Sequence, residues 1–220
     1  MSITLEHIKK NPAVRAYIKK SDESLLAMGF TEHSFAHVTR VAVTAQRILE
    51  ETGHTQRDGE LAAIAGYLHD IGNMINRKGH ETSGALMAFY LLSEMGMPEE
   101  EIATITTTIG NHDESTAFPV NDVAAALIIA DKSDVRRTRV RNKDTIAFDI
   151  HDRVNYAVTQ STITVHKELG EIHLALAIDT EASPLSEYFE IFLSRMILCR
   201  KAAEKLGYQF GLVINGQKMM

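Results

Sequence analysis

The chain lacks the features of secreted and membrane proteins. Its 220 residues include one cysteine, Cys199, so no disulfide can form within the chain and a reducing compartment is favoured. No apolar run is long enough to cross a bilayer, and the charged N-terminal segment has no apolar core of a secretion signal. We therefore expect a cytoplasmic protein that has no membrane partner.

The chain also lacks an excess of basic residues. Asp and Glu outnumber Lys and Arg, and the formal net charge is -6. Domains that bind nucleic acid usually carry a basic excess, so we expect no nucleic-acid partner. No internal repeat or low-complexity tract is present. The length allows one domain, or one domain with an appendage, to bury a sizeable core.

The most informative feature that is present is an adjacent pair, His69 and Asp70. Neighbouring residues of a helix project about 100° apart, so the two side chains can meet only where a helix ends, and we expect Gly72 to provide that ending. Imidazoles and carboxylates without a thiolate are typical of a catalytic site for Zn, Fe, Mn, Co or Ni rather than a structural zinc. Further candidate ligands flank the pair: His37, His80, His112 and Asp131.

Two of these candidates stand among apolar residues. His37 shares a helix face with Val41 and Ala45, at spacings of four and eight, and Asp131 ends an apolar helical run. A buried imidazole or carboxylate needs a polar or charged partner, and a cation would supply it. His33 lies four residues before His37, so spacing alone allows either residue to be the ligand.

Five short segments, taken in order, resemble the HD-domain superfamily of metal-dependent phosphohydrolases. They are residues 36–41, 68–72, 79–81, 111–114 and 130–132, and the likeness runs from about Ser34 to about Arg141. The resemblance implies that one ion is held by His37, His69, Asp70 and Asp131. It implies that a second ion is held by His80, His112 and a bridging Asp70. The chain therefore resembles the two-metal branch, with two divalent transition-metal ions (Fe, Mn, Ni, Co or Zn) as cofactors.

The resemblance also implies a mechanism. Two ions about 3.5–4 Å apart would lower the pKa of a bridging water and polarise a phosphoryl oxygen, which makes Asp70 catalytic as well as metal-binding. Lys132 follows the last ligand, and we expect it to contact phosphate as a catalytic residue; the alternative is an ordinary exposed lysine. Because the residues after His37 follow the family pattern, His33 is expected to face the substrate or to support a ligand.

The expected phosphate-binding residues are basic side chains near the ligands. Many relatives have a lysine where this chain has Asn73, and Arg77 or Lys78 could replace that cation. In the basic segment after the last ligand, Arg136 and Arg137 could clamp a substrate phosphate by bidentate hydrogen bonds. The alternative interpretation of that segment is a solvated connector.

The leading functional hypothesis is hydrolysis of a phosphate ester or phosphoanhydride, with a nucleotide as the expected small-molecule substrate. One alternative is a di-iron oxygenase that acts on a polyol or phosphonate. Another is a non-catalytic metal- or nucleotide-binding regulatory module whose C-terminal sheet recruits a partner or a second copy, giving a homodimer. Cyclic dinucleotide cleavage is disfavoured because no Gly-Tyr-Pro segment follows the histidines.

The predicted fold is mainly α, a helical HD bundle over residues 1–143. Helices are expected to start at Asn11 with Pro12, at Thr31 or Ser34, and at Asn121 or Asp122. They are expected to end at Gly29, Gly53 and Gly96. The helix that starts near His80 is expected to run through Leu86, Phe89 and Leu92. The next helix is expected to start at Pro98, which three glutamates follow.

The C-terminal part, residues 144–220, is predicted as an α+β appendage packed on this core. Alternation over residues 161–167 and 171–178 predicts a β-hairpin, across which His166 and His173 could face each other. A long amphipathic helix from Pro184 to Gly207 would cover it, and residues 208–214 would add a third strand. We expect a small antiparallel sheet.

Overall fold

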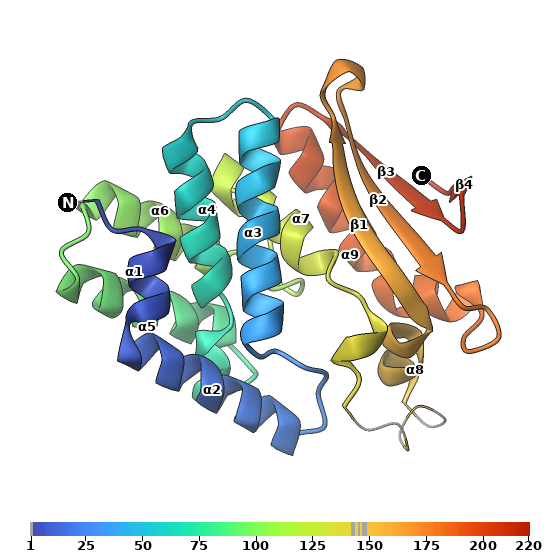
Figure 1. Cartoon of the computed structure of the whole chain (residues 1–220), viewed down its shortest axis with the longest axis horizontal. Helices are drawn as coiled ribbons and strands as arrows, with labels where there is room; N and C mark the ends of the chain where they lie inside the picture. The colour runs from blue at the N-terminus through green and yellow to red at the C-terminus, as the bar shows by residue number, and fades with distance from the viewer. Residues whose placement is uncertain (1, 142–143, 145, 147–148) are drawn as a thin grey trace.

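The fold is mainly α, as predicted, and the computed structural model describes residues 2–141, 144, 146 and 149–220 (Figure 1). The elements before residue 142 are α1 (Leu5–Lys10), α2 (Pro12–Ala27), α3 (Phe35–Glu51), α4 (Gln56–Leu68), η1 (Ile71–Met74), α5 (His80–Glu94), α6 (Glu99–Gly110), α7 (Asp122–Lys132) and η2 (Arg137–Arg139). Those after it are α8 (Ile150–Ala157), β1 (Val158–His166), η4 (Lys167–Leu169), β2 (Glu171–Ile178), α9 (Leu185–Lys205), β3 (Gln209–Ile214) and β4 (Gln217–Lys218). The predicted boundary at residue 143 lies outside the described residues.

The helices begin at the predicted polar residues. The side chain of Asn11 accepts hydrogen bonds from the amides of Ala13 and Val14 at the start of α2. Ser34, not Thr31, caps the helix that carries His37, and Asn121 caps α7. These side chains satisfy amide donors that the first turn leaves without an intrahelical partner, so they fix where the ligand-bearing helices start.

The role predicted for Gly72 was wrong. Helix α4 ends at Leu68, and Gly72 lies within η1 without the positive φ of a helix-ending glycine. A Cβ at this position would overlap the carbonyl oxygen of His80 and lie 2.5 Å from the amide nitrogen of Gly84. Glycine is therefore required because η1 packs backbone against backbone on the first turn of α5.

Helix α7 lies at the centre of the helical part. Every residue from Val123 to Ala130 is buried, as predicted for its apolar run, and α7 packs against α3, α4, α6 and α9. Helices α3 and α4 approach closely because Gly66 has no Cβ, which would lie 2.9 Å from the Cα of Ala42. On α5, Leu92 is buried, whereas Leu86 and Phe89 are exposed.

The C-terminal part contains a four-stranded sheet in the order β1-β2-β3-β4. Strands β1 and β2 form the predicted antiparallel hairpin, and the rings of His166 and His173 lie 4.7 Å apart across it. The prediction of a wholly antiparallel sheet was wrong, because β3 pairs with β2 in parallel. Helix α9 connects these two strands, and a crossover helix returns the chain in the same direction.

Helix α9 joins the two parts of the molecule. It packs against both α7 and β3, behind the sheet in Figure 1. Phe192, Met196 and Ala203 are buried, and they belong to the same continuous hydrophobic core as the helices before residue 142. None of the described helices is long and apolar enough to cross a membrane.

Candidate metal centre and adjoining cavity

The six predicted ligands converge in the folded chain. They come from the middle of the bundle: α3, α5 and α7 carry one each, the turn after α4 carries two, and the segment that follows α6 carries one. Their donor atoms fall into three overlapping groups, each within 4.8 Å: His37, His69 and Asp70; His69, His112 and Asp131; Asp70, His80 and His112. The fold thus brings together side chains that span residues 37 to 131.

Each of the four imidazoles is fixed by a hydrogen bond of its Nδ1 atom. The acceptors are Asp134 Oδ2 for His37 (2.8 Å), Gly66 O for His69 (2.8 Å), Arg77 O for His80 (3.1 Å) and Ile109 O for His112 (2.6 Å). A carbonyl oxygen can only accept, so Nδ1 carries the hydrogen and the Nε2 atom of a neutral ring presents a lone pair. Such bonds orient metal-binding histidines.

The Nε2 atoms meet one another and the carboxylates at the centre. His37 Nε2 and His69 Nε2 are buried and have no hydrogen-bond partner in the part of the chain described. The Nε2 atoms of His80 and His112 lie 3.2 Å apart. Lone pairs in such positions repel unless a proton or a metal ion lies between them. The residues present therefore fit a bound cation.

Asp70 faces histidines from two of these groups. Its Oδ2 atom lies 3.1 Å from His69 Nε2 and 3.5 Å from His37 Nε2, whereas its Oδ1 atom lies 3.5 Å from His80 Nε2. Asp131 Oδ1 lies 3.5 Å from His37 Nε2. A carboxylate with its two oxygens turned to different imidazoles has the arrangement needed to bridge two ions.

The charges of the buried side chains also favour a bound cation at the centre. Burial lowers the pKa of His37, but the carboxylates around it outweigh burial and raise this pKa to about 9. At His69 the effect of burial is likewise outweighed by Asp70 and Asp131, and the pKa rises to about 10. Burial and the nearby cationic groups lower the pKa of His112 to about 3. Without a metal, protons on two imidazoles would balance the buried carboxylates; a divalent cation supplies that charge in their place.

Asp134 supports the centre and was missed by the sequence analysis. It is buried, its Oδ2 atom accepts the hydrogen bond of His37, and its Oδ1 atom lies 2.9 Å from Arg136 Nε and 3.1 Å from Arg40 Nε. The signal was its spacing, because Asp134 comes three residues, about one turn, after Asp131.

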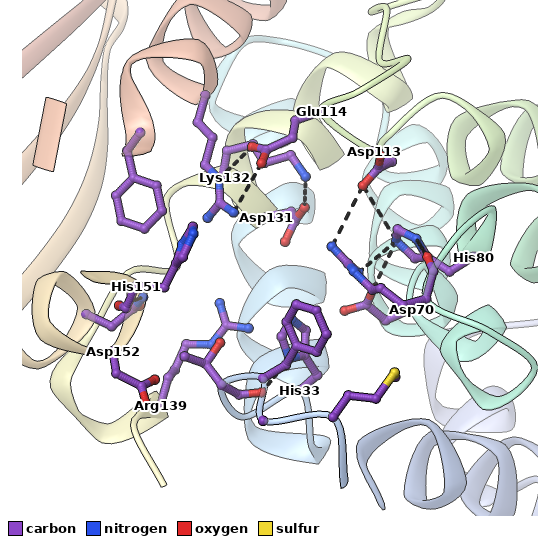
Figure 2. A pocket seen from close by; sticks show the side chains of 18 of the residues that line it. His33, Asp70, His80, Asp113, Glu114, Asp131, Lys132, Arg139, His151 and Asp152 are labelled. Carbon is purple, nitrogen blue, oxygen red and sulfur yellow. Dashed lines mark hydrogen bonds and ion pairs between the residues drawn. The ribbon is translucent and has the colours of Figure 1, made fainter. Parts of the chain in front are cut away.

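A cavity of about 360 Å³ opens beside the centre (Figure 2). Of the residues predicted to act on substrate, Lys132, Arg77 and His33 line it. Lys132 Nζ lies 2.6 Å from Asp131 Oδ2. His33 donates a hydrogen bond from Nδ1 to the carbonyl oxygen of Thr31 (2.7 Å) and does not join a ligand group.

The structure does not bring Lys78, Arg136 or Arg137 to the cavity. Lys78 is exposed, Arg136 binds Asp134, and Arg137 lies 3.0 Å from Asp179. Arg139 from the same basic segment lines the cavity instead. Its Nε and Nη1 atoms donate to the carbonyls of Glu32 and Asp134, both at 2.8 Å.

The C-terminal part supplies the wall opposite the centre. Figure 2 shows His151 and Asp152 across the cavity from Asp70 and His80. Lining residues that the sequence analysis did not assign to the site include Met28, Phe30, Asp113, Glu114, Asp149, His151, Asp152, Asn155, Phe192 and Arg195. Arg195 carried a signal, since it stands on the buried stripe of α9 between Phe192 and Cys199.

The molecule is a mainly α-helical protein that buries converging imidazoles and carboxylates able to hold a metal ion. The family model of the HD domain matches residues 34–153, which is more than half of the chain. The chain belongs to the HD-domain family, whose members are mostly metal-dependent phosphohydrolases. A comparison with curated proteins gave no match.

Proposed function

We propose that the protein is a metal-dependent phosphohydrolase that cleaves a phosphate ester or phosphoanhydride, with a nucleotide as the expected substrate. The observation that carries the proposal is the position of Asp70, whose two oxygens face different histidines at the edge of a cavity lined by cations. Two divalent ions bound there would activate a water and polarise a phosphoryl oxygen. The activated water would then be the nucleophile, and no protein side chain would attack the phosphorus.

The basic residues of the cavity support this proposal. Lys132 is 7% exposed and directs its ammonium group at the cavity beside Asp131. Arg77 Nη1 donates to Asn73 Oδ1 at 3.3 Å, and Asn73 stands where the resemblance led us to expect a lysine. A phosphate placed at the metal ligands would meet both cations, which neutralise charge on the phosphate and on the leaving oxygen.

Cys199 does not serve as an alternative nucleophile. Burial raises the pKa of its thiol to about 12, so the thiol is protonated at neutral pH, and the thiolate is the reactive form. The side chain lies on the buried face of α9, is wholly buried and does not line the cavity.

The proposal is tested with protein loaded separately with Mn, Fe, Co, Ni or Zn and offered a panel of nucleotides and phosphomonoesters. We expect phosphate release with at least one metal, its loss in Asp70→Ala, and its retention in Asp122→Ala, which removes a carboxylate outside the cavity. Bound metal without phosphate release would contradict the proposal. Oxygen uptake by the iron-loaded protein would indicate an oxygenase, and nucleotide binding without turnover a regulatory module.

A further inference from the structure

We propose that Arg195, on the helix that follows the matched HD segment, binds an anionic oxygen of the substrate. The inference rests on the proposed function only in naming that anion as phosphate. Arg195 lines the cavity together with Lys132 and Asp131, although it lies 64 residues along the chain from the latter. The proposal gives the C-terminal part a role in substrate binding.

Two contacts hold the guanidinium of Arg195 in a fixed orientation. Its Nε atom lies 2.6 Å from Glu114 Oε2 and its Nη2 atom lies 3.3 Å from Glu114 Oε1, so the carboxylate occupies one edge of the group. The face of the guanidinium lies over Phe192, with Cζ 4.4 Å from the ring centroid. Phe192 is 1% exposed, so the ring is itself fixed by the core. An arginine held in this way loses little freedom when it binds a ligand.

One edge of the guanidinium remains for a ligand. Glu114 engages Nε and Nη2, and no hydrogen bond of Nη1 is found within the described residues. A guanidinium has five N–H donors in one plane, so it can bind a carboxylate along one edge and a phosphate along another. The Arg195 side chain keeps 24% of its surface exposed and borders the cavity.

Two of the other cations of the cavity are more fully engaged than Arg195. Arg139 uses Nε and Nη1 on backbone carbonyls and is 6% exposed, and Lys132 is paired with Asp131 at 2.6 Å. Among the helices before residue 142, Arg77 also offers a partly exposed guanidinium to the cavity, and Arg195 adds preorganised donors from the C-terminal part.

A structural role for the same ion pair makes a different prediction. Glu114 follows α6 and Arg195 lies on α9, so their contact also straps the two parts of the chain together. Glu114→Gln and Arg195→Gln both remove the ion pair of this contact, and a purely structural role would make both variants weaken phosphate binding. Anion binding predicts effects of opposite sign, because Arg195→Gln removes the cation whereas Glu114→Gln frees it from a competing carboxylate.

The experiment measures binding of inorganic phosphate to the metal-loaded protein by calorimetry, and hydrolysis of p-nitrophenyl phosphate. We expect Arg195→Gln to weaken phosphate binding roughly tenfold or more, the loss of one charge-assisted hydrogen bond, and to raise KM more than it lowers kcat. Arg195→Lys should recover part of the loss, and Glu114→Gln should tighten phosphate binding. Arg200→Gln, an exposed arginine on the same helix, is the control and should change neither.

Weakening of phosphate binding by both Glu114→Gln and Arg195→Gln would overturn the inference in favour of the strap, and so would unchanged phosphate binding in Arg195→Gln. These outcomes can be distinguished from a failure of the proposed function. If no phosphoester is hydrolysed but phosphate binding still depends on Arg195, the hydrolase proposal fails and the anion site stands.

Discussion

Asp134 differs from the other acceptors that orient the imidazoles. Three of the four rings donate to backbone carbonyls, whereas His37 donates to the carboxylate of Asp134, which is buried between arginines. A carboxylate behind a ligating imidazole fixes its tautomer and increases the basicity of its other nitrogen. Asp134 should therefore control how tightly the centre binds metal through His37.

Replacing Asp134 should weaken metal binding without removing a ligand. We expect Asp134→Ala to reduce metal affinity about 10- to 100-fold, and Asp134→Asn to reduce it less, because the amide oxygen still accepts from Nδ1. Titration against a competing chelator measures this. Asp179→Ala is the control, since it removes a carboxylate that pairs with an arginine and no histidine. Unchanged affinity in Asp134→Ala would show that the contact does not support the centre.

The sequence was informative for the ligands and much less so for the residues that face the substrate. Polar residues such as His37 and Asp131 stand out because they interrupt apolar stripes. Arg195 and Glu114 lie 81 residues apart, so their contact depends on tertiary packing that no local pattern records. Arg139, rather than Arg136, reaches the cavity because η2 turns the chain within that basic segment.

Among the elements, caps and glycines allowed prediction of the helices that carry ligands. Two features of the fold were not predicted from the sequence. Helix α8 is only 8 residues long and follows a segment without clear periodicity, although it lines the cavity with Asn155. The parallel pairing of β3 could not be read from alternation, because alternation gives the face of a strand and not its direction.

The contact between η1 and α5 provides a test at the scale of elements. Gly72→Ala places a Cβ against the backbone of α5, which cannot move aside as a flexible side chain would. We expect a loss of roughly 2–3 kcal/mol in the free energy of unfolding together with weaker metal binding, because Asp70 and His80 flank this contact. Urea unfolding measures the first and chelator competition the second.

Gly110→Ala is the matched control, because its added Cβ would meet only the Ala85 side chain at 3.8 Å. This substitution lies in a helix and should be neutral or slightly stabilising. Equal stability of the Gly72→Ala variant and the parent protein would contradict the packing described here.

For the whole molecule, the centre predicts a pH dependence that metal removes. In the metal-free protein the pKa of His37 is raised to about 9 and that of His69 to about 10. A histidine whose pKa is raised in the folded state contributes stability that is complete below its unfolded value of about 6.5 and is lost as pH rises through the folded value. The metal-free protein should therefore lose stability from about pH 6.5 to about 10.

The metal-loaded protein should not show this loss, because the ions replace the protons on these imidazoles. Thermal unfolding of both forms across this pH range makes the comparison. Burial and nearby cationic groups lower the pKa of His112 to about 3. Its titration therefore changes the stability below pH 6.5 and does not affect the alkaline range. Parallel pH profiles for the two forms would contradict the charge balance inferred for the centre.

The central claim is that six side chains from the middle of the bundle hold two ions that share Asp70. Anomalous diffraction from a crystal grown with Mn²⁺ tests it directly. The account predicts two anomalous peaks, one among His37, His69, Asp70 and Asp131 and the other among Asp70, His80 and His112. The absence of a peak at these residues, or ions bound only elsewhere, would contradict it.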